Sequence, residues 1–105
     1  RIRMTADLDV NTHISEADFQ ATVVGMAKAF KWKFYHTHDS RRSNPGFPDL
    51  VMVRGDRMIV AELKSERGSI SPAQESWLTA LRRLGFVEVY VWHPSDRDQI
   101  ERILQ

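Results

Sequence analysis

The sequence predicts an α/β domain whose elements follow the order α-β-β-β-α-β-α, with a central mixed sheet flanked by helices. Three observations lead to this fold class. Apolar residues recur at helical spacing in residues 16–30 and again in residues 71–84. Between these helices, two apolar runs flank Gly55-Asp56, which is typical of a two-residue hairpin turn. A third apolar run, residues 86–92, follows the second helix, so it should join the sheet in parallel.

The composition is that of one small domain. Its 105 residues are 42% hydrophobic, which is enough for a single core. Cysteine is absent, which excludes a disulfide framework and a thiolate metal site and fits a reducing cytoplasm. No apolar run approaches transmembrane length, and no signal peptide is evident. We expect one domain over residues 15–105, preceded by an N-terminal arm, residues 1–14, for which we expect partial disorder.

The first helix is predicted over residues 16–30. Ser15 precedes it, and Asp18 follows three residues later, a pattern typical of a capping box. Residues 32–38 then form a predicted strand, and residues 39–46 form a polar loop dense in turn residues. The apolar residues of the helix fall on one stripe that should face the core: Phe19, Val23, Met26, Ala27 and Phe30.

The hairpin spans residues 48–64, and its turn sets a testable register. Continued pairing away from a two-residue turn places Asp49 directly opposite Glu62. Opposed residues have Cβ atoms only about 4.5–5.5 Å apart and point to the same face of the sheet. The period of two returns Lys64 to that face. Three ionisable groups therefore meet at one end of an otherwise apolar hairpin, unless a β-bulge shifts the register.

The second helix should begin after Ser71. Pro72 suits its first position, Gln74 completes a Ser-x-x-Gln capping box, and Gly85 is the expected stop. Its apolar residues are Trp77, Leu78, Leu81 and Leu84.

The last strand, residues 86–92, is nearly all β-branched or aromatic, so it is predicted to be buried. Ser95 should cap a final short helix. The inward residues of that helix are expected to be Ile100, Ile103 and Leu104.

The residue types at the end of the hairpin suit divalent metal chemistry. Opposed carboxylates repel unless a cation lies between them. Carboxylate oxygens are hard ligands that favour Mg²⁺ or Mn²⁺ over soft metals. A metal held there could polarise a phosphate and supply or orient a hydroxide nucleophile, while Lys64 could stabilise phosphorane charge or orient the attacking water. A solvated strand end with a chance Glu-x-Lys is the weaker alternative, because the register and the apolar surroundings argue against it.

Two helix residues are further candidates, each with an ordinary structural alternative. Glu16 lies one turn before Phe19 and faces the body of the protein, so it could be a third carboxylate at the metal. A first-turn acid also complements the helix dipole by about 0.3–1 kcal/mol, and position alone favours that role. Gln74 completes its capping box but shares the inward face of its helix, from which it could reach a phosphate or an attacking water.

Charge is distributed unevenly although the net charge is only +1. A protein with an acidic metal site can look neutral when a basic substrate track offsets its carboxylates. Two histidines at a spacing of two, with no third ligand nearby, are weak evidence for zinc. For His36 and His38 a partly exposed edge strand outweighs a zinc site, and the functional alternative is contact with a phosphate or the metal-bound water. The basic and histidine side chains before the hairpin are Lys28, Lys31, Lys33, His36, His38, Arg41 and Arg42, with Asp39 the one acid among them.

At Pro48-Asp49 and Glu62-Leu63-Lys64 the chain resembles the PD-(D/E)XK nuclease superfamily. More narrowly, it resembles the VRR-NUC (virus-type replication-repair nuclease) family over about residues 15–98. The bare superfamily motif is weakly specific, and the added glycine before Pro-Asp and the Gln-x-x-Trp after the lysine make the narrower resemblance strong. The similar stretches are Glu16 to Gln20, His36 through Ser40-Arg41-Arg42 to Leu50, Ala61 to Lys64, Ser71 to Leu78 and Trp92 to Asp96.

The resemblance implies a restriction-endonuclease-like core and an Mg²⁺- or Mn²⁺-dependent endodeoxyribonuclease. It implies that Asp49 and Glu62 bind metal together with the backbone carbonyl of Leu63. By the same pattern Lys64 is catalytic, Gln74 assists, and Glu16 is the helix-borne acid, which reaches the metal directly or through water. The DNA-binding residues would be His36, His38, Ser40, Arg41 and Arg42.

The resemblance also implies a biological setting. Stand-alone members similar to this chain resemble Holliday-junction resolvases of phages and bacteria, so we expect a homodimer that cuts four-way DNA junctions in the cytoplasm of a bacterial or phage-infected cell. Two matched cuts need two sites, which a symmetric dimer supplies. The alternatives are a flap, nick or other repair nuclease, and a non-catalytic DNA-binding module. Restriction-type cutting ranks low because 105 residues leave little room for sequence recognition.

Overall fold

The computed structural model describes residues 10–37 and 44–105. Predictions for residues 1–9 of the N-terminal arm, and for His38, Ser40, Arg41 and Arg42, lie outside the described residues. From residue 16 on the predicted element order is confirmed, with a short 3₁₀ helix before the last α-helix. Residues 10–12, which belong to the predicted arm, are helical. The elements are α2 (Glu16–Ala29), β1 (Lys33–His36), β2 (Leu50–Arg54), β3 (Arg57–Leu63), α3 (Pro72–Arg82), β4 (Val87–Trp92), η1 (Pro94–Asp96) and α4 (Arg97–Leu104).

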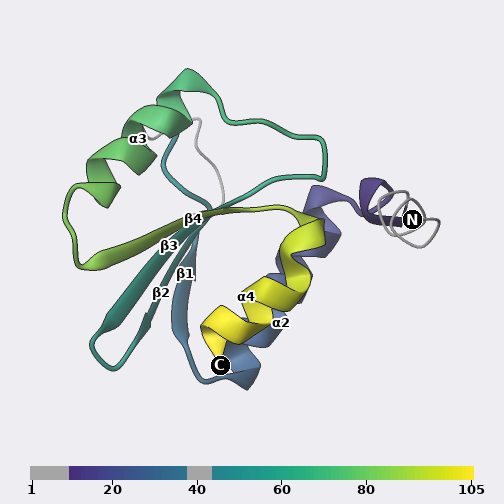
Figure 1. Cartoon of the computed structure of the whole chain (residues 1–105), viewed down its shortest axis with the longest axis horizontal. Helices are drawn as coiled ribbons and strands as arrows, with labels where there is room; N and C mark the ends of the chain where they lie inside the picture. Colours follow the sequence, from purple (N-terminus) through teal and green to yellow (C-terminus); the bar gives the residue numbers. More distant parts are fainter. Residues whose placement is uncertain (1–9, 38–43) are drawn as a thin grey trace.

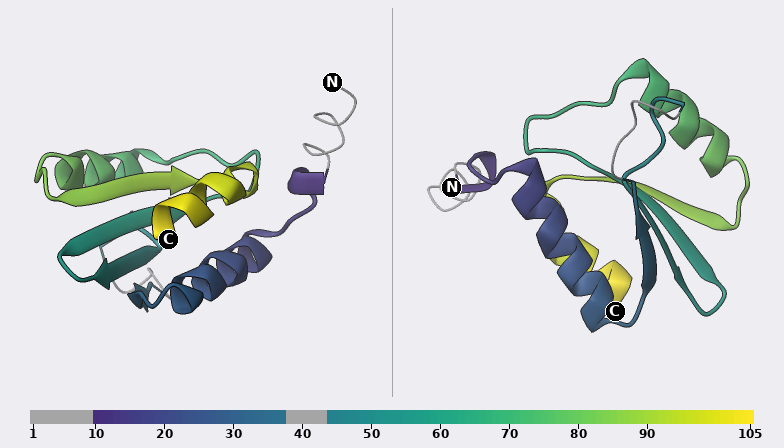
Figure 2. Two further views of the ribbon diagram at one scale, coloured as in Figure 1. Left: turned by 60° about the horizontal axis from the view of Figure 1, so that its bottom comes forward. Right: turned by 180° about the vertical axis from the view of Figure 1, so that it is seen from behind.

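The four strands form one mixed sheet in the order β1-β2-β3-β4 (Figure 1). The first three strands are antiparallel neighbours, and β4 lies parallel to β3, as the intervening helix predicted. Helices α2 and α4 lie together on one side of the sheet, and α3 lies on the other (Figures 1 and 2). In the part of the chain that the structure describes, no helix is long and apolar enough to cross a membrane.

The hairpin register is the one that its turn predicts. Arg54 pairs with Arg57, and the pairing continues without a bulge to Leu50 opposite Ala61. Gly55 adopts a φ of 62°, the positive value that the first central position of such a turn requires. The next step of this register places Asp49 opposite Glu62.

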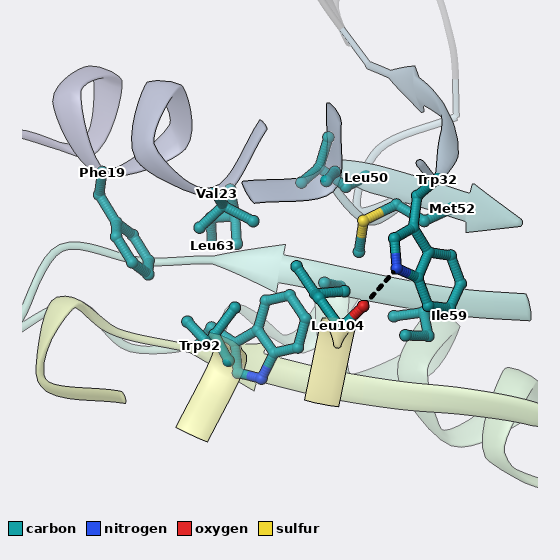
Figure 3. Close-up of a cluster of buried hydrophobic side chains, with 12 residues drawn as sticks. Phe19, Val23, Trp32, Leu50, Met52, Ile59, Leu63, Trp92 and Leu104 are labelled. Atoms are coloured by element: carbon teal, nitrogen blue, oxygen red, sulfur yellow. Dashed lines mark hydrogen bonds between the residues drawn. The ribbon is translucent and has the colours of Figure 1, made fainter. Parts of the chain in front are cut away.

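The main core fills the space between the sheet and the α2–α4 layer (Figure 3). Alternate residues of β2 and β3 point into it, so the remaining residues of these strands must face α3. On that side Val60 and Leu78 are fully buried. The main cluster consists of Phe19, Val23, Ala27, Trp32, Leu50, Met52, Ile59, Ala61, Leu63, Trp92, Ile100 and Leu104.

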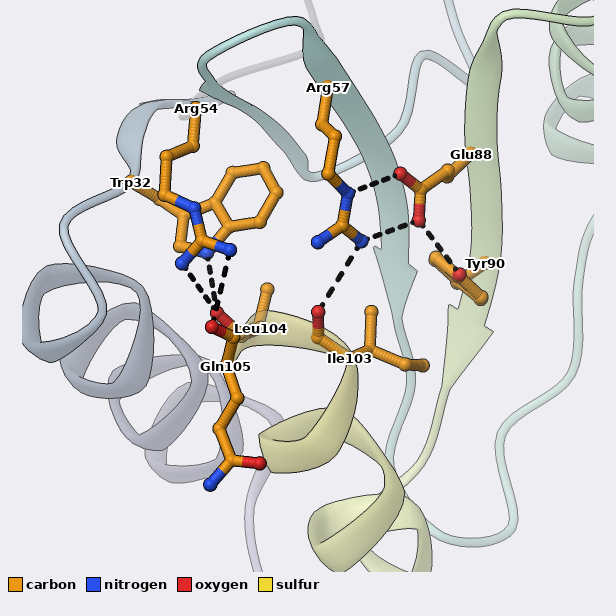
Figure 4. A network of polar contacts seen from close by, with 8 residues as sticks. All are labelled: Trp32, Arg54, Arg57, Glu88, Tyr90, Ile103, Leu104 and Gln105. Atoms are coloured by element: carbon orange, nitrogen blue, oxygen red, sulfur yellow. Dashed lines mark hydrogen bonds and ion pairs between the residues drawn. The ribbon is translucent and has the colours of Figure 1, made fainter.

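Two arginines fasten the turn end of the hairpin to the helix ends (Figure 4). The guanidinium of Arg54 donates to the carbonyls of Phe30 and Leu104, both at 2.9 Å. Arg54 and Arg57 also lie over the ring of Trp32, at 4.5 and 5.0 Å from its centroid. Cations at helix C-termini complement the exposed carbonyls there. The ends of α2 and α4 are thereby fixed to the hairpin.

An ion pair ties β3 to β4 next to this cluster. Arg57 forms a bidentate pair with Glu88, with both N–O distances 2.8 Å. This hydrogen bonding holds the pKa of the Glu88 carboxyl below its usual value. The hydroxyl of Tyr90 donates to the same carboxylate at 3.1 Å.

Three local predictions differ from the structure. Asp96, and not Ser95, is the N-cap of α4, because Pro94 starts η1 and moves the α-helix on by one residue. The last strand is only partly buried, since α3 covers one part of an edge strand, and Phe86 before it is 70% exposed. Leu84 lies beyond the end of α3 and is 52% exposed.

Gly46 lets the loop before Asp49 pack against α3. Its φ is +94°, and a Cβ atom there would lie 2.5 Å from the backbone of Ala73 in the first turn of the helix. Phe47 follows it and packs edge-on against Trp77, with ring centroids 5.0 Å apart. This loop therefore reaches Pro48-Asp49 in a fixed position relative to α3.

We expect Gly46→Ala to destabilise the protein by about 2–5 kcal/mol, because it adds a backbone clash to an unfavourable positive φ. Gly85→Ala is the matched control. Gly85 has a φ of 79°, but nothing lies within 4 Å of a Cβ built there, so only the conformational cost of about 1–2 kcal/mol should appear. Urea denaturation of both variants measures the difference. Equal losses of stability would show that the contact with Ala73 does not constrain the loop.

Candidate active site

Four of the predicted site residues come together where β3 ends beside the first turn of α3. Asp49 stands directly before β2, and its Oδ2 accepts a hydrogen bond of 2.8 Å from the backbone amide of Leu63. This bond ties Asp49 across the open end of the hairpin, where the register places it opposite Glu62. Lys64 follows β3, and its amide continues the pairing with β4 by donating to the Trp92 carbonyl at 2.9 Å.

Glu62 is the centre of the group. It is 2% exposed, the one buried charged residue among the described residues. Its Oε2 accepts a hydrogen bond of 2.9 Å from the side-chain amide of Gln74 and lies 3.6 Å from the ammonium nitrogen of Lys64. Its Oε1 is buried and has no hydrogen-bond partner. One oxygen of this carboxylate therefore receives donors from the protein and the other receives none; Asp49, itself an acceptor, can bond to Glu62 only by sharing a proton with it.

Burial raises the pKa of Glu62 to about 8, and the negative charge of the adjacent Asp49 adds to the rise. The positive charge of Lys64 opposes the shift without cancelling it. Without a further cation, the site therefore holds a proton at neutral pH. The positive charge of Lys64 therefore does not offset the combined negative charge of Asp49 and Glu62.

Gln74 links the capping of α3 to this group. Its side-chain oxygen accepts from the backbone amide of Ser71 at 2.9 Å, and its backbone amide donates to the Ser71 hydroxyl at 3.2 Å, so the predicted capping box is present. The same side chain donates through Nε2 to Glu62. The capping role and the site role, which the sequence leaves as alternatives for Gln74, occur together.

The residues present fit a hard divalent cation. An ionised carboxylate oxygen buried without a donor is costly, whereas a cation bound to it removes the cost. Asp49 and Glu62 supply the oxygen ligands that Mg²⁺ and Mn²⁺ prefer. One or two carboxylates are the usual protein contribution to an Mg²⁺ site, with water and phosphate oxygens completing the shell.

Glu16 does not join this group. It is exposed at the first turn of α2, and α2 packs on the sheet face opposite to α3. Within residues 10–37 and 44–105, no three His, Asp or Glu side chains are close enough to hold one metal ion. Glu16 complements the helix dipole in its observed position, together with Asp18 in the same turn.

His36 points toward α2. It pairs with Leu50, a core residue, and its ring contacts the side-chain amide of Gln20 on α2, with an Nε2–Nδ1 distance of 3.3 Å. The same amide nitrogen of Gln20 also contacts the other ring nitrogen of His36, Nε2. Gln20 was not predicted as a site residue, although it shares one face of α2 with Glu16 at a spacing of four.

His93 is a neighbour of the site that the sequence analysis missed. The parallel register sets Leu63 beside Trp92, so the next residues, Lys64 and His93, are neighbours on the α3 side. The ring Nε2 of His93 lies 3.2 Å from the Gly68 carbonyl, and Glu66 accepts from the amide of Ser95 at 3.0 Å. These contacts hold the loop that connects Lys64 to α3. The sequence did contain a signal for this: His93 comes directly after β4, which was predicted to lie parallel in the sheet that also contains the strand ending in Glu62 and Lys64.

Comparison with known proteins gives one family match. The family model described as the VRR-NUC domain matches residues 10–95, most of the chain and all of the residues assembled at the end of β3. The search of curated proteins finds no match.

We expect the metal-free protein to lose stability as the pH rises from about 4.5 to about 8. In this window the folded state keeps the Glu62 proton, which the unfolded state releases, so deprotonation favours unfolding. The free energy of unfolding of Glu62→Gln should therefore rise relative to that of the wild type over this range, by on the order of a few kcal/mol at pH 8 and above. Thermal melts in EDTA between pH 5 and 9 measure the difference. Glu101→Gln, which changes an exposed carboxylate, should show no such trend, and a pH-independent effect of Glu62→Gln would contradict the raised pKa.

Proposed function

Because the chain belongs to the VRR-NUC family, it is a nuclease domain, and we propose that it hydrolyses DNA phosphodiester bonds with Mg²⁺ or Mn²⁺ held by Asp49 and Glu62. The observation that carries the metal requirement is the buried, unpartnered Oε1 of Glu62 beside the second carboxylate. The carbonyl of Leu63 is proposed as a further ligand. Glu16 is not close enough to share one ion with Asp49 and Glu62, so we propose a role for it only through an intervening water.

The bound metal would polarise the scissile phosphate and lower the pKa of an attacking water. The side chains around it have separate tasks. Lys64, 14% exposed and 3.6 Å from Glu62, places a positive charge where negative charge grows on the phosphoryl oxygens. Gln74 donates to Oε2 of Glu62, and Oε1 would remain available to hold the metal. The Leu63 amide orients Asp49 through Oδ2 in the same way.

We further propose that the substrate is branched DNA, above all the four-way junction, and that the protein acts on it as a homodimer. One site of this size cuts one strand, so paired cuts require two copies related by symmetry. Flap or nick cleavage and DNA binding without catalysis are the competing outcomes of the tests below.

We expect cleavage of labelled four-way junction in Mg²⁺ or Mn²⁺, none in EDTA, and a loss of roughly 10³-fold or more in Asp49→Asn, since metal stabilisation of the transition state is worth several kcal/mol. The matched control is Asp56→Asn, which changes an acid at the far turn of the same hairpin. Flap and linear duplex run in parallel rank the substrates. Cutting that persists in EDTA or in Asp49→Asn would contradict the metal site, and binding without cutting would favour the DNA-binding alternative.

Light scattering at micromolar concentration, with and without junction, tests the dimer. We expect the mass of two chains on the junction. A single-chain mass in both conditions would contradict paired cutting by one assembly.

We expect Gln74→Ala to lower the cleavage rate by about 10- to 100-fold, because Glu62 loses the donor that orients it. The same change also weakens the cap of α3, so Ser71→Ala is the control. It removes the other half of the capping box, at a cost of about 1 kcal/mol, without touching Glu62. Equal cleavage by the two variants, measured at a temperature where both are folded, would show that Gln74 acts only as a cap.

A further inference from the structure

Tyr35 lies on the same sheet face as Asp49, one strand away, although it is no part of the motif. Tyr35 pairs with Val51 on β2. The pairing of the two strands continues beyond β1, because the amide of Thr37 donates to the Asp49 carbonyl at 2.9 Å. Tyr35 is therefore a diagonal neighbour of Asp49 and shares its sheet face. Diagonal neighbours lie about 7–8 Å apart, within reach of an aromatic side chain.

This part of the sheet face is open to solvent. Helix α3 covers β3, where Val60 is fully buried, and the cover decreases toward the edge strand β1. Val51 is half-buried, and Tyr35 is 65% exposed. Core packing explains the neighbouring Phe34, which points to the other face and packs against the main cluster, but it does not explain Tyr35. A large ring is thus presented to solvent next to the proposed metal site.

A cation continues the row. Lys33 stands two residues before Tyr35, so it projects from the same face, and it is exposed. Along β1 the open face therefore offers a lysine, then an aromatic ring, then the approach to the carboxylates. Alternation of positive charge and exposed aromatic rings is the arrangement by which proteins follow single-stranded nucleic acid, with phosphates on the cations and bases on the rings.

We propose that Tyr35 stacks on an unpaired base adjacent to the scissile phosphate and that Lys33 contacts the backbone of the same strand. This inference rests on the proposed function and specifies its substrate. A ring fixed on a strand can stack on a base only after the base leaves its own stack, which costs least at a branch point. The site therefore selects the splayed nucleotides of a junction or flap over continuous duplex.

The test uses junctions with 2-aminopurine at successive positions around the branch, whose fluorescence is quenched by aromatic stacking. Anisotropy gives the dissociation constant, with the full chain in EDTA so that no strand is cut. We expect Tyr35→Leu to weaken junction binding by roughly 5- to 100-fold and to abolish the quenching at one position. Tyr35→Phe should retain both, and binding to linear duplex should change little in either variant.

Phe86→Leu is the matched control, because Phe86 is 70% exposed and stands at the opposite end of the sheet, next to the hairpin turn. The proposal is overturned if Tyr35→Leu behaves like Phe86→Leu, or if the wild-type protein forms no quenched complex with the junction. It is also overturned if Tyr35→Leu reduces the mass of the assembly while the quenching remains, which would make this face a contact between two copies.

The two proposals fail separately. Cutting by the wild type without any effect of Tyr35→Leu would remove the stacking role and leave the nuclease function intact. Quenching that depends on Tyr35, in a protein that cuts none of the substrates with either metal, would support the stacking contact and contradict the proposed catalysis.

Discussion

The structure depends on the placement of one carboxylate, that of Glu62, where water does not reach it and a second carboxylate stands opposite. Such a pair is unstable by itself, because burial and repulsion both oppose its charge. Each neighbour offsets part of this cost in a specific way. The Leu63 amide binds Asp49, and Lys64 and Gln74 bind one oxygen of Glu62. The remaining oxygen receives no donor from the protein, and this is the feature on which the proposed metal site rests.

Holding two repelling groups in place requires rigidity elsewhere. At the far end of the hairpin, Arg54 and Arg57 lie over Trp32 and bind helix-end carbonyls, so the strands cannot slide relative to α2 and α4. At the near end, the loop through Gly46 packs on α3 so tightly that no side chain fits. A shift of one residue in register would turn Glu62 into the apolar core and Ala61 toward the metal. The contacts at the turn end of the hairpin therefore keep the register that places Asp49 opposite Glu62 at its open end.

The sequence predicted those parts of the site that depend on local geometry. The two-residue turn and the period of two were sufficient for the hairpin register, and the capping box was sufficient to place Gln74 in the first turn of α3. Contacts that arise from the docking of separate elements could not be predicted in the same way. Glu16 has the azimuth of a site residue on its own helix, but its distance from the two carboxylates depends on how α2 docks on the sheet, which local geometry does not determine. His93 becomes a neighbour of Lys64 only through parallel pairing across a whole helix.

The uneven cover of the sheet follows from the same requirement. Helix α3 must pack on β3 to bring Gln74 to Glu62 and to exclude water from that carboxylate. If α3 also covered β1 and β2, the carboxylates would be closed to a polymer substrate. A sheet in which α3 covers β3 and β4 but leaves β1 and β2 open excludes water from Glu62 and still admits a polymer substrate. The exposed edge strand is a hazard that proteins limit by keeping such strands short and charged. Here β1 has four residues and begins with Lys33, so the open face is available to nucleic acid while pairing with another sheet edge is disfavoured.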